Sequence, residues 1–128
     1  MHAAIPMACP LLRLAAMPAQ PDRWCRLSAE AIGWVPEEPG VFEVANLVRS
    51  VLYVGRGEGN LRARLREITR STGLLPPMAG GFYFRFQLTP REDEAFASLV
   101  GTYRTRHAGR DPRLNGAVAA PGTQRDAA

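Results

Sequence analysis

The sequence predicts an α+β domain in which a small three-stranded antiparallel sheet is flanked by helices, in the order β-β-α-β-α. Two short apolar runs, 40–45 and 50–55, and one strictly alternating run, 82–88, predict the strands. The segments that follow the second and third runs carry apolar residues at helical spacing. A chain of 128 residues with 46% hydrophobic and 22% charged residues can fold as one domain around one core.

The ends of the chain differ in composition from its centre. Residues 1–22 contain four prolines and little periodicity, which is typical of a flexible N-terminal arm. Residues 116–128 are mostly small and polar and are expected to form a disordered C-terminal tail. The domain is therefore predicted to occupy 23–115.

Neither a membrane anchor nor a cysteine-based site is predicted. The chain has no run of eighteen apolar residues, so no membrane association is expected, and a cytoplasmic location is the default expectation. Arg13 interrupts the one short apolar stretch near the N-terminus, which argues against a signal peptide. Cys9 and Cys25 lack the spacing of a disulfide framework or a zinc site.

The first predicted elements are a short helix and a hairpin. Ser28 is expected to cap a helical turn that ends near Ile32, before a proline-rich segment. The runs 40–45 and 50–55 then pair through a turn at 46–49.

A helix follows the hairpin, and Asn60 is its expected N-cap. Its buried stripe consists of Leu61, Leu65 and Ile68. A second stripe, expected to face solvent, consists of Arg62, Arg66 and Arg70.

The last strand and helix have clear patterns. In 82–88, aromatic residues and leucine alternate with polar residues, which predicts a half-buried strand. Thr89 is expected to cap a helix that begins at Pro90. Acidic side chains in its first turn suit the helix dipole; they are Glu92, Asp93 and Glu94. The apolar stripe of this helix consists of Ala95, Phe96, Leu99, Val100 and Tyr103.

The charge of the chain is concentrated in one segment. The formal net charge is +4, the sequence pI is about 9.8, and all sixteen basic residues are arginine. Between Arg49 and Arg70 there are six arginines and only two acidic residues, which makes a focused positive patch. Arginine suits phosphate oxygens and base edges, so DNA or RNA is the expected partner, although GC-rich coding would also favour arginine over lysine.

Two stretches, PGVF at 39–42 and LYVGRGEGNLRARL at 52–65, are similar to sequence motifs of a known protein family. With the order of the predicted elements, they resemble the GIY-YIG nuclease superfamily, which includes homing endonucleases, some restriction enzymes and the incision subunit of bacterial nucleotide excision repair. The resemblance covers about 39–115, and only the two quoted stretches are specific.

The resemblance implies roles for several residues. Tyr53 corresponds to the second motif tyrosine, and Arg64 to the helix arginine that binds the scissile phosphate. Arg56 follows the second motif, where relatives often carry a basic residue, and Asn115 resembles an asparagine that follows the last helix. The motif glycines are Gly40 and Gly55.

Two positions depart from the family pattern. Phe42 stands where the first tyrosine is expected, and its ring has no hydroxyl to accept or relay a proton. Leu99 stands at the position of the metal-binding glutamate, and its nearest alternatives are Ala97, Val100 and Gly101. Mg²⁺ requires oxygen ligands, so loss of both groups predicts inefficient hydrolysis.

The leading hypothesis is a nucleic-acid-binding protein that grips the phosphate backbone and has lost efficient nuclease activity. The predicted contacts come from Arg56, Arg62, Arg64 and Arg66, with Tyr53 beside them. Target selection could require another protein. A third hypothesis assigns the fold to protein interaction alone.

The alternative is a Mg²⁺- or Mn²⁺-dependent DNA endonuclease in which the acidic group has moved to Glu94 or Glu92. A carboxylate oxygen within about 7 Å of the Arg64 guanidinium would favour it, because both groups could then share a phosphate and its metal.

Overall fold

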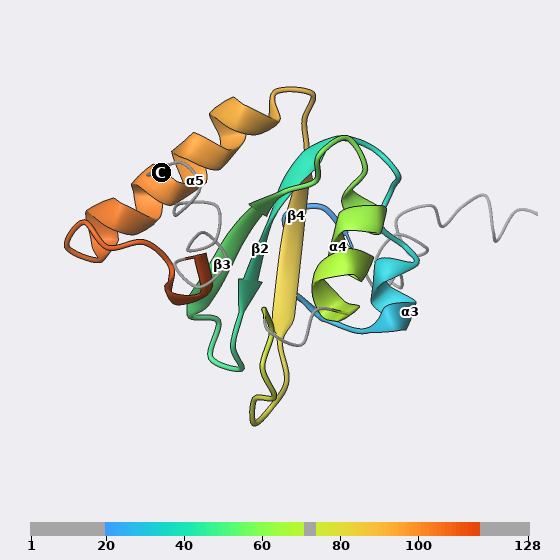
Figure 1. The fold of residues 1–128 in the computed structure, drawn as a ribbon, viewed down its shortest axis with the longest axis horizontal. Helices are drawn as coiled ribbons and strands as arrows, with labels where there is room; N and C mark the ends of the chain where they lie inside the picture. Colours follow the sequence, from blue (N-terminus) through green and yellow to red (C-terminus); the bar gives the residue numbers. More distant parts are fainter. Residues whose placement is uncertain (1–19, 71–73, 116–128) are drawn as a thin grey trace, which may run out of the picture.

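The computed structural model describes residues 20–70 and 74–115 and confirms the α+β class. The sheet is antiparallel and has four strands in the order β1-β4-β2-β3 (Figure 1). The elements are β1 (Cys25–Arg26), α3 (Ala29–Ile32), β2 (Gly40–Ala45), β3 (Val51–Arg56), α4 (Leu61–Arg70), β4 (Tyr83–Leu88) and α5 (Glu92–Arg106). Within the described chain, no helix is both long and apolar enough to cross a membrane.

The prediction of three strands was wrong because it missed β1. This strand has two residues, and Cys25 and Arg26 pair with Phe84 and Tyr83 of β4. Two residues are too few for an alternating pattern to be visible in a sequence. The chain already contacts the sheet before β1, since the Asp22 amide donates a hydrogen bond to the Phe86 carbonyl at 2.8 Å. The rest of the predicted arm, residues 1–19, and the predicted tail, 116–128, lie outside the described residues.

The predicted N-caps of α3 and α4, Ser28 and Asn60, are both confirmed. The hydroxyl of Ser28 accepts a hydrogen bond from the Ala31 amide at 3.1 Å. The side-chain oxygen of Asn60 accepts one from the Ala63 amide at 3.0 Å. Each cap satisfies one amide that the first turn of a helix leaves without an intrahelical partner.

Helix α5 begins later than predicted, at Glu92 instead of Pro90. The Thr89 hydroxyl accepts a hydrogen bond from the Arg91 amide at 3.0 Å, which holds 89–91 in a turn before the helix. Of the predicted apolar stripe, only Val100 is fully buried, and the other members are half-buried. The side of α5 that faces the sheet therefore remains partly exposed to solvent.

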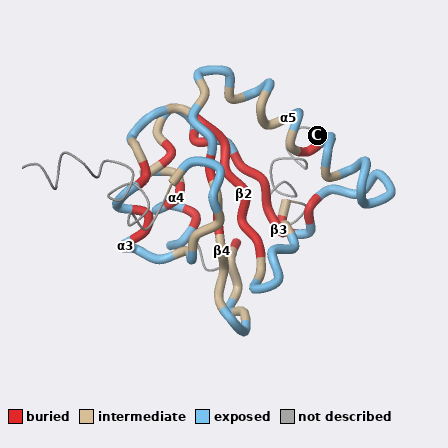
Figure 2. The backbone as a smooth tube through the Cα atoms, turned by 180° about the vertical axis from the view of Figure 1, so that it is seen from behind, coloured by how far each residue is buried: buried red, intermediate tan, exposed pale blue. Residues whose placement is uncertain are grey.

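The helices form two layers around the sheet. Helices α3 and α4 lie on one side, and α5 lies on the other, against β2 and β3 (Figure 1). Strand β2 is buried along its whole length, as its continuous red trace shows in Figure 2. The core beneath α4 contains Phe42, Phe84 and Phe86, each at most 2% exposed, together with the predicted leucine and isoleucine stripe of α4.

Candidate functional site

A pocket of about 200 Å³ lies at the β3 edge of the sheet. Its walls come from β3, the loop after it, α4, α5 and the turn that follows α5. The lining residues are Tyr53, Val54, Gly55, Arg56, Glu58, Arg64, Phe96 and Asn115. Five residues that the sequence singled out for a site or motif role, separated by up to about sixty positions, therefore meet in one place.

Gly55 allows two aromatic rings to pack beside this pocket. The rings of Phe42 and Tyr53 lie 5.8 Å apart between centroids, on adjacent strands. A Cβ atom on Gly55 would lie 2.5 Å from the Phe42 ring and 2.8 Å from the Tyr53 ring. Only a residue without a side chain fits at this position. Phe42 and Tyr53 are both buried, at 1% and 4% exposure.

Arg64 lies on the flank of α4 that faces the pocket. The buried stripe of α4 occupies the centre of the inner face, and the 100° step per residue places position 64 to one side of it. Its Nη1 atom donates to Oε1 of Glu67 at 2.8 Å. Its Nε atom is buried and has no hydrogen-bond partner among the described residues.

The Arg64 guanidinium remains charged at every physiological pH. Burial acts to lower the pKa of Arg64, but the hydrogen bond with Glu67 and the nearby Tyr53 and Glu58 outweigh it and raise that pKa. Arg64 is thus a permanent cation, only 21% exposed in its side chain, with one donor unused.

Arg56 supplies the second cation of the pocket from the end of β3. It pairs with Asp93 at the start of α5, at 2.6 Å, and its guanidinium lies 5.3 Å from the centroid of the Phe96 ring. The side chain of Arg56 is 45% exposed, and that of Asp93 is 85% exposed. An ion pair so open to water holds its arginine weakly, so Arg56 can turn toward another anion.

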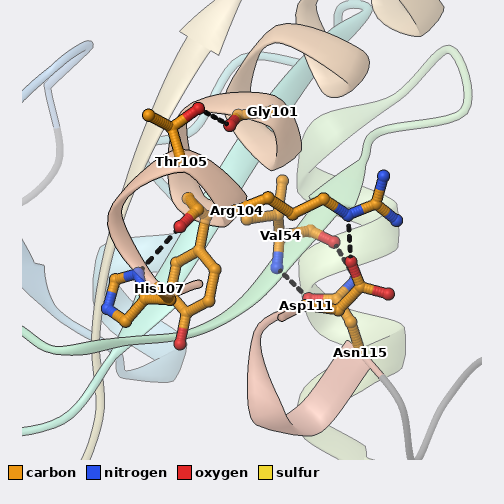
Figure 3. Close-up of polar contacts among 8 residues, drawn as sticks. Val54, Gly101, Arg104, Thr105, His107, Asp111 and Asn115 are labelled. Carbon is orange, nitrogen blue, oxygen red and sulfur yellow. Dashed lines mark hydrogen bonds and ion pairs between the residues drawn. The ribbon is translucent and has the colours of Figure 1, made fainter. Parts of the chain in front are cut away.

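Asn115 closes the pocket by pairing with the edge strand. Its side-chain oxygen accepts a hydrogen bond from the Val54 amide at 2.7 Å, and its side-chain nitrogen donates to the Val54 carbonyl at 2.8 Å (Figure 3). Strand β3 ends the sheet, so these two backbone groups have no neighbouring strand. The amide of Asn115 takes the place of a strand residue and fixes the segment after α5 beside Tyr53 and Arg64.

The other two predicted contact arginines lie elsewhere. Arg62 donates from Nε to the Val35 carbonyl at 2.8 Å and lies 3.8 Å from a carboxylate oxygen of Glu37. It therefore ties α4 to the segment after α3. Arg66, one turn further along the same flank, is exposed. The predicted arginine patch thus divides between two sides of α4, and only Arg56 and Arg64 line the pocket.

The acidic residues that the sequence proposed as displaced metal ligands have other partners. Glu92 accepts hydrogen bonds from the amides of Gly40, Glu58 and Gly59 at 2.9, 3.0 and 2.9 Å. Glu94 is exposed and pairs with Arg91 at 3.6 Å. Neither residue lines the pocket.

The loop at 56–60 holds an anionic side chain. Its amides bind the Glu92 carboxylate, which comes from a helix more than thirty residues away. The glycines in the loop indicate that its backbone can approach another group closely. The sequence gives no sign of which carboxylate is bound, so this contact could be found only from the fold.

The carboxylates nearest to Arg64 are Glu67 and Glu58. Glu67 meets the 7 Å criterion set for the enzyme alternative, but it is 69% exposed and already engaged by Arg64. Glu58 lines the pocket directly. The described residues contain no group of three or more acidic, histidine or cysteine side chains placed to hold a metal.

Helix α5 contributes an apolar side chain to the pocket. Phe96 is its lining residue, whereas Leu99 faces a separate hollow beside Glu43 and Arg85. Neither Phe96 nor Leu99 can ligate a cation, so α5 offers no carboxylate where the resemblance implies one.

Residues 17–106 match the model of a protein family described as Domain of unknown function (DUF7508). The chain belongs to this family. The DUF7508 match includes every described strand and helix named above and ends before Asn115. No curated protein matches the chain.

Proposed function

We propose that this DUF7508 protein is a GIY-YIG-like nucleic-acid-binding protein without efficient nuclease activity, and that it binds a phosphate of DNA or RNA in the pocket of Tyr53, Arg56 and Arg64. The observation that supports the proposal most is the buried Nε of Arg64, which lacks a hydrogen-bond partner among the described residues.

A buried donor without an acceptor costs about 1–3 kcal/mol, so the site gains free energy when an acceptor arrives. The partner of Arg64 in its i,i+3 pair, Glu67, is 69% exposed, and such helix pairs contribute only about 0.2–0.5 kcal/mol, so Glu67 can release the arginine at little cost. A phosphate group suits the planar guanidinium because two of its oxygens can accept two parallel hydrogen bonds. Arg56, held by an acid that is 85% exposed, lines the same pocket and can bind the same phosphate.

The same pocket lacks what efficient hydrolysis needs. Phe42 has no hydroxyl, and the α5 side chain that reaches the pocket is Phe96. From these residues we infer binding of nucleic acid without efficient cleavage; we further propose that the protein acts in the cytoplasm and that another protein selects its target.

Glu58 supports a second candidate, a Mg²⁺- or Mn²⁺-dependent DNA endonuclease. Its carboxylate lines the pocket beside Arg64, and one or two carboxylates with substrate oxygens can hold Mg²⁺. Glu58 replaces Glu94 as the acidic residue of this candidate, since Glu94 does not line the pocket.

Labelled single-stranded, duplex and branched DNA, and single-stranded RNA, are incubated with the protein and Mg²⁺ or Mn²⁺, and binding and cleavage are measured together. We expect binding without cleavage, about tenfold weaker for Arg64→Ala, from the loss of one charge-assisted contact. Arg66→Ala, on the opposite flank of α4, is the matched control and should retain most of the affinity. Circular dichroism establishes that each variant is folded.

Glu58→Gln separates the two candidates. In a binding protein, loss of this negative charge raises the affinity for nucleic acid, because it removes repulsion of the phosphate. In a metal-dependent nuclease, the same loss abolishes cleavage. Equal loss of affinity in Arg64→Ala and Arg66→Ala would contradict the pocket and indicate diffuse charge attraction. Absence of any binding would overturn the proposal.

A further inference from the structure

A second, larger cleft of about 530 Å³ lies at the C-terminal end of α5. It is lined by Tyr103, Arg106, His107, Ala108, Arg110, Asp111 and Arg113. None of these residues takes part in the pocket described above. The segment 103–113 holds four arginines and a single acidic residue, Asp111.

The one acid of this segment is already neutralised. Arg104, which does not line the cleft, binds Asp111 from Nε to Oδ1 at 2.5 Å (Figure 3). The three arginines that do line it form no ion pair with another residue in the described part of the chain. The cleft therefore presents three uncompensated cations.

The helix dipole accounts for only part of this charge. Cations near a helix C-terminus are favoured by the dipole, which explains Arg104 and Arg106 in the last turn of α5. Arg110 and Arg113 lie beyond the helix, where the effect of the dipole has faded. The same dipole opposes an anion at this end, so a ligand here needs more than one arginine to hold it.

Two aromatic rings also line the cleft. Tyr103 and His107 are stacked, with centroids 3.7 Å apart and planes at 7°. The Nδ1 atom of His107 lies 2.8 Å from the Tyr103 carbonyl, which can only accept, so Nδ1 carries the hydrogen (Figure 3). Aromatic rings interleaved with arginines are the usual means by which proteins hold single-stranded nucleic acid, because every base has a flat face to stack.

The cleft and the first pocket are joined by one short, firmly held segment. The half-exposed Arg104–Asp111 pair lies at its beginning, and the pairing of Asn115 with Val54 fixes its end (Figure 3). Pro112 is fully buried and Leu114 is 7% exposed, so the segment is also packed into the protein.

Along α5, the separation of the two sites corresponds to several nucleotides. Arg56 lies at the N-terminal end of α5 through its pair with Asp93, and the cleft lies at the other end. The fifteen residues of α5 span about 22 Å at about 1.5 Å per residue. A stacked strand advances about 3.4 Å per nucleotide, so about six nucleotides reach along α5 from Arg56 to the cleft. On the side of the segment 111–115 the pocket and the cleft are neighbours, since Asn115 lines one and Arg113 the other.

From these observations we propose that the cleft at the end of α5 is a second nucleic-acid-binding site, which takes a single-stranded segment by phosphate contacts with Arg110 and Arg113 and by stacking on Tyr103 and His107. The path between the two sites rests on the proposed function of the Arg64 pocket. The cleft itself does not.

Fluorescence anisotropy with labelled oligo(dT) of about four and about sixteen nucleotides tests this site, since the longer strand can occupy the pocket and the whole cleft at once. The cleft variant is Arg110→Gln with Arg113→Gln, and the matched control is Arg66→Gln with Arg70→Gln, which removes the same charge from α4. We expect the cleft variant to weaken binding of the longer strand about tenfold and to lower its salt dependence by about 1.4 in logarithmic slope, at about 0.7 per phosphate. The control should change affinity less than about threefold, a general charge effect.

Tyr103→Leu keeps an apolar side chain and removes the stack. We expect it to weaken binding of the longer single strand and to leave binding of a duplex of the same length unchanged. The assignment to single strands would be overturned if the wild-type protein bound the single strand and the duplex with equal affinity, or if Tyr103→Leu left the affinity for the single strand unchanged.

The two proposals fail separately. If the cleft variant binds the longer strand like wild type while Arg64→Ala does not, the cleft site is refuted and the Arg64 pocket stands. If the cleft variant loses affinity and Arg64→Ala does not, the second site holds and the first is refuted.

Discussion

Glu92 holds three separate parts of the fold together, and its removal should be far more damaging than that of a neighbouring acid. Its carboxylate accepts hydrogen bonds from Gly40 at the start of β2 and from Glu58 and Gly59 in the loop before α4. Hydrogen bonds to a charged group contribute about 1.5–3 kcal/mol each when buried and less when water competes. Gly40 is buried, whereas Glu58 and Gly59 are exposed.

The expected effect follows from these three bonds. In Glu92→Ala the Gly40 amide loses its partner inside the protein, at about 1–3 kcal/mol, and the two loop amides turn to water at a smaller loss. We expect the free energy of unfolding to fall by about 3 kcal/mol and the melting temperature by about 15 °C for a domain of this size. Glu92→Gln keeps one acceptor oxygen and should lose about 2 kcal/mol.

Glu94→Ala is the matched control, because it removes an acid from the same helical turn. Its side chain is 74% exposed and its ion pair with Arg91 is long, at 3.6 Å, so it should change stability by less than about 0.5 kcal/mol. Urea and thermal unfolding of the three variants give the comparison. If Glu92→Ala unfolds at the same urea concentration as Glu94→Ala, the carboxylate does not anchor the loop.

Two further substitutions test the packing around the pocket. Gly55→Ala should lower the free energy of unfolding in urea by about 1–3 kcal/mol, because its Cβ would overlap the rings of Phe42 and Tyr53. The control is Gly101→Ala, which should be neutral or stabilising because a Cβ there meets nothing within 4 Å. Equal stability of the two variants would refute the contact of Gly55 with the rings. Asn115→Ala removes two hydrogen bonds to the edge strand, so it should lower the free energy of unfolding by about 1–3 kcal/mol and speed hydrogen exchange of the amides at the β3 edge. Unchanged exchange at these amides would show that the pairing is dispensable.

Local patterns in the sequence predict much of this fold. The stripe of Leu61, Leu65 and Ile68 and the alternation in 82–88 depend on neighbours along the chain. The stripe is confirmed, and the strand is confirmed over Tyr83–Leu88 with Phe84 and Phe86 buried, whereas Leu88 at its end is exposed. Strand β1 could not be predicted, because a two-residue strand exists only through its partner β4. The late start of α5 follows from a hydrogen bond of Thr89 that propensity alone does not specify.

The sequence was sufficient to predict several residues of the candidate site, but not the contacts that these residues make. Tyr53, Arg64 and Asn115 were singled out by motif spacing and do line one pocket. Arg62 and Arg66 share the composition of the patch, but the turn of α4 carries them to its other flank. The partner of Glu92 and the stack of Tyr103 on His107 both depend on tertiary geometry, which sequence spacing does not contain.

Nuclear magnetic resonance of the arginine Nε–Hε groups during titration with an oligonucleotide tests the central claim most directly. The account predicts saturable shifts of the Arg64 and Arg56 signals and slower hydrogen exchange at the Arg64 Nε, as its unused donor gains a phosphate acceptor. The Arg62 signal should stay in place, since its Nε already donates to the Val35 carbonyl. An unchanged Arg64 signal at a concentration that saturates binding would contradict the assignment of this pocket to phosphate.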